Sequence, residues 1–170
     1  MKKQWLMGAA VALILAGPCV QAKSISNKAE RDDVTLMADA DPAMQKAFAL
    51  AQKTLPDFLR DAANPKEGTS AYALKVGLTD GSGTEYFWVS DFVQKGDQFT
   101  ATLANTPRRV RGYRQGQKIS FKQSQIVDWM YMDAGKKRMM GNYTACALLS
   151  KEPPAEAEAF KKQYGLRCDH

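Results

Sequence analysis

The sequence predicts an α+β protein, in which an N-terminal helix packs on a twisted antiparallel β-sheet and a short helix follows near the C-terminus. Two patterns support this class. Apolar residues recur at helical spacing between residues 44 and 62, and from Ala71 onward they alternate with polar residues. The alternating segments are joined by short turns, which favour antiparallel strands. The pattern leaves open whether the sheet is an open layer or closes into a barrel-like form.

Residues 1–22 resemble a cleavable signal peptide. Two lysines open the chain, an apolar run covers residues 6–16, and small residues precede a cleavage position after Ala22. An uncleaved anchor and lipidation of Cys19 are the alternatives. The run is shorter than the roughly 20 apolar residues that a membrane span requires. We therefore expect a periplasmic or secreted bacterial protein with no membrane span after signal cleavage.

The remaining chain divides into a polar arm and one domain. Residues 23–41 carry charges of both signs and few apolar residues, which predicts a flexible N-terminal arm. Residues 42–170 are expected to form a single α+β domain. Asp41 followed by Pro42 is a typical helix start, and Pro56 inside the apolar stripe predicts a kink or restart near Thr54.

After this helix, the period of two and the turn residues predict a series of short strands. The segment 144–150 fits either a short helix or a strand, and Pro153-Pro154 begins a final polar helix that ends near Gly165. The expected strands cover residues 71–78, 85–90, 99–103, 117–121 and 126–132.

The cysteines predict one disulfide. Cleavage of the leader would remove Cys19 and leave Cys146 and Cys168, which tend to pair in an oxidising compartment. Their spacing is not that of a Cys-x-x-Cys redox pair, so a structural bridge is favoured over a catalytic one.

Composition excludes several classes of function. The chain has one histidine, His170, at its last position, so neither a histidine-dependent catalytic relay nor a zinc site with paired histidines is expected. No glycine-rich phosphate loop followed by Lys-Ser/Thr occurs. We expect no cofactor and no resident metal.

The strongest local anomaly is positive charge. Between Asp97 and Asp128 there is no acidic residue, and basic side chains gather around one loop that also carries a tyrosine. Guanidinium groups bind phosphate and carboxylate groups. A solvated, solubilising loop is the alternative interpretation. Nucleic acid is not an expected partner of an exported protein. The candidate binding residues are Arg108, Arg109, Arg111, Tyr113, Arg114 and Lys118.

Two further groups invite weaker hypotheses. Asp128 precedes Trp129, and a carboxyl group whose pKa is raised by burial could serve as a catalytic acid or base. The alternative is that Trp129 fills the core while Asp128 pairs with a nearby donor. Four methionines between residues 130 and 140 fall on one predicted hairpin, where they would form an adaptable apolar surface.

Several short motifs resemble the YegJ-like proteins, a family of small, often exported bacterial proteins without an established function. The resemblance covers residues 43–150, and its most specific parts are Asn105-Thr106-Pro107 after a strand and the dipeptide Asp128-Trp129. Family members often carry Gly-Asp where this chain has Gly116-Gln117, so that carboxylate is absent here. The resemblance implies a single exported bacterial domain and no particular catalytic residue.

Two functions follow as hypotheses. The first is a non-catalytic binding module that contacts an anionic envelope component or a protein partner through the basic loop. The second is a hydrolase or lyase that acts on an envelope polymer with Asp128 as its acid or base. The first is favoured because the chain lacks the rest of a catalytic apparatus.

Overall fold

The computed structural model describes residues 41–169, and the predicted leader and nearly all of the predicted arm lie outside this range. The first element of the described part is helix α2 (Pro42–Ala63). The carboxylate of Asp41 caps it by accepting the N–H of Ala43 at 2.8 Å. The helix continues through Pro56, so the restart expected near Thr54 does not occur. Leu55 and Phe58, buried on either side of the proline, hold both halves against the core.

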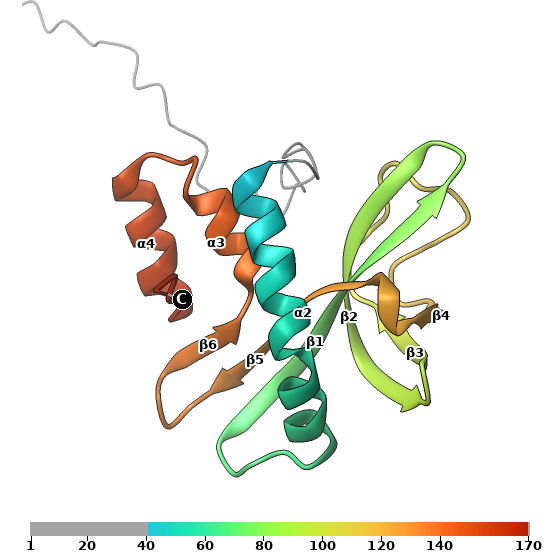
Figure 1. Cartoon of the computed structure of the whole chain (residues 1–170), viewed down its shortest axis with the longest axis horizontal. Helices are drawn as coiled ribbons and strands as arrows, with labels where there is room; N and C mark the ends of the chain where they lie inside the picture. The colour runs from blue at the N-terminus through green and yellow to red at the C-terminus, as the bar shows by residue number, and fades with distance from the viewer. Residues whose placement is uncertain (1–40, 170) are drawn as a thin grey trace, which may run out of the picture.

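Six antiparallel strands form one sheet in the order β4-β3-β2-β1-β5-β6. Because β4 and β6 are edges, the sheet is open rather than a closed barrel, and the predicted α+β class is confirmed (Figure 1). The strands are β1 (Thr69–Asp80), β2 (Gly83–Lys95), β3 (Gln98–Leu103), β4 (Lys118–Lys122), β5 (Ile126–Asp133) and β6 (Arg138–Gly141).

Irregularities in the strands curve the sheet. The pairing of β2 with β3 shifts between Ser90 and Val93, where Asp91 has a φ of 51°. The pairing of β1 with β5 shifts near Ala71, which has a φ of 53°. Such bulges bend a strand and increase its twist. The expected strand over 85–90 is therefore the first half of a longer, bent strand.

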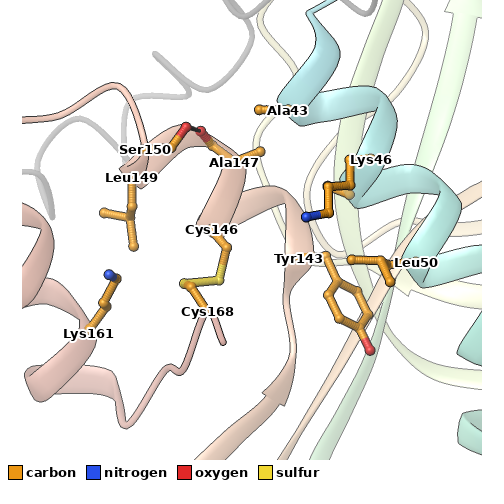
Figure 2. Close-up of a pocket in the computed structure, with 11 residues that line it drawn as sticks. Ala43, Lys46, Leu50, Tyr143, Cys146, Ala147, Leu149, Ser150, Lys161 and Cys168 are labelled. Carbon is orange, nitrogen blue, oxygen red and sulfur yellow. Dashed lines mark hydrogen bonds between the residues drawn. A yellow bond between two sulfur atoms is a disulfide. The ribbon is translucent and has the colours of Figure 1, made fainter. Parts of the chain in front are cut away.

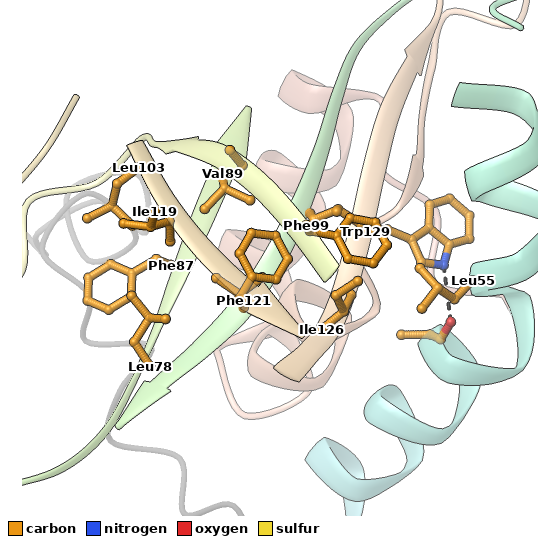
Figure 3. Close-up of a cluster of buried hydrophobic side chains, with 14 of the residues drawn as sticks. Leu55, Leu78, Phe87, Val89, Phe99, Leu103, Ile119, Phe121, Ile126 and Trp129 are labelled. Atoms are coloured by element: carbon orange, nitrogen blue, oxygen red, sulfur yellow. Dashed lines mark hydrogen bonds between the residues drawn. The ribbon is translucent and has the colours of Figure 1, made fainter. Parts of the chain in front are cut away.

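The curved sheet and helix α2 enclose one main core. Figure 3 shows Phe87, Phe99 and Phe121 between the strands, and Trp129 beside Leu55 of α2. The indole N–H of Trp129 lies 3.2 Å from the carbonyl oxygen of Ala51, so this large side chain both fills the core and ties β5 to α2.

The C-terminal part adds two short helices, α3 (Tyr143–Leu149) and α4 (Pro154–Tyr164). The ambiguous segment 144–150 is therefore helical. Cys146 of α3 is bonded to Cys168 in a disulfide, as predicted. Leu166 forms a parallel bridge with Met139 of β6, which holds the tail against the sheet edge.

Within residues 41–169, no helix is long and apolar enough to cross a membrane.

Candidate functional site

The arginines singled out from the sequence lie on one long loop between β3 and β4, which we call the arginine loop (residues 104–117), and Lys118 is the first residue of β4. Its anchor is Val110, whose side chain is buried in the main core. At the start of the loop, the side-chain oxygen of Asn105 accepts the backbone N–H of Trp88 at 2.9 Å. This contact explains the Asn-x-Pro motif: the asparagine extends the pairing with β2, and the proline then ends the strand.

A buried carboxylate organises the loop from beneath. Glu85 of β2 is 1% exposed, and it accepts the backbone N–H groups of Arg108, Arg109 and Val110 at 2.9, 2.9 and 3.0 Å. Hydrogen bonds to a charged acceptor are stronger than neutral ones. Three successive backbone groups are thereby fixed around one side chain.

A second carboxylate holds the next part of the loop. Asp80, at the end of β1, accepts the backbone N–H of Arg111 at 2.6 Å, and its other oxygen accepts the hydroxyl and N–H of Ser82. The Ser82 hydroxyl, followed by the two backbone N–H groups, lowers the pKa of Asp80 to about 2. The carboxylate is therefore ionised at neutral pH.

Two glutamines near the end of the loop form hydrogen bonds with its backbone. The side-chain N–H of Gln115 donates to the carbonyl of Ala104 at 2.8 Å, and the side-chain oxygen of Gln117 accepts the N–H of Arg114 at 3.0 Å. Gln117 thus supplies a hydrogen-bond acceptor to the backbone of the loop.

The structure places the predicted binding residues on this loop, with Lys118 directly after it at the start of β4. The side chains of Arg108, Arg109, Arg111, Arg114 and Lys118 are exposed, and Tyr113 is half-buried against the core. Within residues 41–169, the guanidinium groups of Arg109, Arg111 and Arg114 form no salt bridge. The two carboxylates beneath the loop are engaged by its backbone instead.

Our sequence reasoning missed the structural role of Glu85. The sequence did indicate that this carboxylate is buried, because in the alternating pattern Glu85 shares the inward face of β2 with Phe87 and Val89. A carboxylate on an apolar strand face must find several donors. Which donors it finds depends on a loop more than 20 residues further along, which the pattern does not show.

Asp128 lies in a different place and is completely buried. Its carboxylate accepts the backbone N–H of Trp129 at 2.8 Å, together with the N–H and hydroxyl of Thr144 at 2.8 and 2.7 Å. The buried ammonium of Lys75, which faces Asp128 across β1 and β5, donates to the same Thr144 hydroxyl at 3.1 Å. Burial raises the pKa of Asp128, and the Thr144 hydrogen bonds oppose this rise.

This arrangement favours a structural role for Asp128. Both carboxylate oxygens are occupied by protein donors, and the side chain has no exposed surface to offer a polymer substrate. Its hydrogen bonds join β5 to the first residues of α3. Glu85, another buried carboxylate, lies on β2 and is occupied by backbone N–H groups of the arginine loop. No cluster of three or more His, Cys, Asp or Glu side chains that could hold a metal occurs in the described part of the chain.

The four methionines do not form one free surface. All are half-buried, and Met139 packs in a small cluster with Leu149, Ala157 and Leu166 near the disulfide. On the other side of the disulfide is a hollow of about 330 Å³ between α2 and α3. Figure 2 shows Lys46 and Tyr143 on one side of this hollow, and the disulfide and Lys161 on the other.

Comparison with known proteins places the chain in a bacterial family. Residues 41–168 match the family described as "Uncharacterized protein conserved in bacteria (DUF2314)", which covers helix α2, the whole sheet and the C-terminal helices. The chain belongs to this family.

A similar relative is the "Uncharacterized protein YegJ" of Escherichia coli (strain K12), which is 32% identical over 119 residues. The alignment covers 70% of this chain and 75% of the relative. The resemblance to YegJ-like proteins drawn from the motifs is therefore confirmed. No solved structure matches the chain.

Proposed function

We propose that this protein is an exported bacterial binding module that contacts an anionic component of the cell envelope through the arginine loop. The ligand groups are phosphates or carboxylates, which guanidinium forks bind in pairs of parallel hydrogen bonds. The predicted signal peptide supports the location, and a Cys146–Cys168 disulfide is compatible with an oxidising compartment.

The observation that carries this proposal is the separation of charge within the loop. The carboxylates of Glu85 and Asp80 accept backbone N–H groups of the loop, while Arg109, Arg111 and Arg114 are exposed and form no salt bridge with a described residue. The charge of Arg111 also helps to lower the pKa of Asp80. A merely solubilising loop needs no such anchoring.

The hydrogen bonds that hold the loop backbone also affect its affinity for an anionic ligand. A mobile loop must be ordered when its ligand binds, and that ordering reduces the binding free energy. A loop whose backbone is already held by buried carboxylates avoids most of this cost. The arginines then act as a preformed cationic surface, whose attraction to anions weakens with added salt.

The test is co-sedimentation of the protein, purified in its naturally processed form, with vesicles that contain phosphatidylglycerol. The variant Arg109→Glu/Arg111→Glu should bind at least roughly 30-fold more weakly, since each arginine near an anionic surface contributes about 1 kcal/mol. The control Lys53→Glu/Lys66→Glu changes the net charge equally at exposed positions on α2 and the following turn. It should bind nearly as well as the wild type.

Three results would contradict the proposal. The wild type fails to bind anionic vesicles, it binds uncharged vesicles equally well, or both double variants lose the same affinity. In the last case, net charge rather than the arginine loop accounts for binding. If a protein binds this protein and its binding requires Arg109 and Arg111, then the ligand of the arginine loop is a protein and not an envelope component.

A further inference from the structure

A second basic surface lies away from the arginine loop, where the β5–β6 turn meets the end of α4 and the C-terminal tail. It forms a hollow of about 690 Å³, which we call the basic hollow. Small-molecule sites in proteins have volumes of about 300–1,000 Å³. The charged residues that line it are Lys136, Lys137, Arg138, Glu158, Lys161, Lys162, Arg167 and Asp169.

Positive charge in the basic hollow is only partly balanced. Its two carboxylates are already paired: Glu158 with Lys161 at 2.9 Å, and Asp169 with Arg167. Lys136 pairs with Asp133 of β5 at 2.8 Å. Lys137, Arg138 and Lys162 form no ion pair with any residue between 41 and 169.

Arg138 contributes a guanidinium group to the lining of the basic hollow. Its Nε–H is buried and has no hydrogen-bond acceptor among the described residues. A buried donor without an acceptor is rare in folded proteins and costs about 1–3 kcal/mol. Because this Nε–H has no exposed surface, an anion in the hollow would bind the terminal N–H groups of the guanidinium, which match the geometry of phosphate.

The hollow is built on rigid parts of the fold. Gly165, which ends α4 with a φ of 63°, lies so close to the β5–β6 turn that a Cβ atom would be 2.6 Å from the carbonyl oxygen of Lys137. Leu166 bridges to Met139, and the disulfide fixes Cys168 two residues further on. These contacts therefore fix the backbone of the tail and the turn that carry the basic side chains.

We infer that the basic hollow binds a small anion carrying two or more phosphate groups. The site is distinct from the arginine loop: Figure 1 shows α4 and the β5–β6 hairpin at one end of the molecule, and β4 with the loop before it at the other. This inference does not depend on the proposed envelope ligand.

The test is isothermal titration calorimetry of the whole processed protein with tripolyphosphate at low salt. The wild type should bind at least one equivalent, since the arginine loop is also proposed to bind phosphate groups. Lys137→Glu/Lys162→Glu should bind about tenfold more weakly or worse, because two cationic contacts are reversed. Both side chains are exposed and unpaired within the described residues, so the variant should fold. Lys53→Glu/Lys66→Glu is the control with the same charge change at exposed positions outside both proposed sites, and it should retain the wild-type affinity.

A second variant tests the guanidinium group of Arg138. Arg138→Gln retains part of the side chain and removes the guanidinium fork, and it should also weaken tripolyphosphate binding about tenfold. The inference is overturned if the wild type does not bind, or if the control loses as much affinity as the hollow variants. If phosphatidylglycerol vesicles compete with tripolyphosphate for the hollow, the natural source of phosphate is a lipid headgroup. If they do not compete, the natural ligand is a soluble anion. Either result supports the site.

Discussion

Replacement of Glu85 by Gln tests how the arginine loop is held. The side chain is 1% exposed and accepts three backbone N–H groups at 3.0 Å or less. Glutamine keeps one acceptor oxygen and turns an amide N–H₂ toward the same donors. At least one buried N–H is then left without an acceptor, and the remaining bonds lose their charged partner.

The expected cost follows from these contacts. An unpaired buried donor costs about 1–3 kcal/mol, and a hydrogen bond to a charged group contributes about 1.5–3 kcal/mol. Because neighbouring bonds do not add independently, we expect Glu85→Gln to lower the free energy of unfolding by about 2–4 kcal/mol. Urea unfolding followed by tryptophan fluorescence measures this loss.

Hydrogen exchange locates the effect. The amides of Arg108, Arg109 and Val110 should exchange much faster in Glu85→Gln than in the wild type, while amides in β1 follow only the global loss of stability. The control is Glu67→Gln, at an exposed glutamate in the turn after α2, which should change stability by less than about 0.5 kcal/mol. If the two variants unfold alike and the loop amides keep their protection, Glu85 does not organise the loop.

Three other predictions concern the remaining carboxylates and the disulfide. Asp128→Asn should lower the free energy of unfolding, measured in urea, by about 2–4 kcal/mol and leave vesicle binding unchanged. A variant that is as stable as the wild type but loses an envelope-polymer cleavage activity would restore the catalytic hypothesis. Cys146→Ser/Cys168→Ser should lower stability by about 3 kcal/mol, and adding reductant to the wild type should give the same loss. The folded pKa of Asp80, about 2, lies below its ordinary value of 3.8, so its stabilising effect is present above that value and is lost as the pH falls through 2. An NMR titration of the Arg111 amide should have its midpoint near 2, and a midpoint near 3.8 would contradict the hydrogen bond.

Local patterns predicted the elements and part of their packing. Asp41 and Pro42 marked the start of α2, and the alternation of apolar residues placed most strands within a few residues of their observed bounds. Each of these signals acts between near neighbours in the sequence. The disulfide also followed, because only two cysteines remain after the predicted cleavage.

Interactions between distant segments were not predictable in this way. β1 pairs with β5 about 50 residues later, and nothing in either strand alone specifies that pairing. Glu85 and Asp128 are both buried carboxylates, and their donors come from a loop and a helix that become neighbours only in the folded chain. The basic hollow likewise combines residues from a hairpin turn, α4 and the tail.

The central claim is that the arginine loop is already ordered before any ligand binds. Backbone ¹⁵N relaxation of the free protein tests it most directly, at the amides of residues 108–114. Order parameters of about 0.85, equal to those of the neighbouring strands, are the predicted result. Values below about 0.6 would show a loop that moves freely despite Glu85 and Asp80, and they would contradict the account.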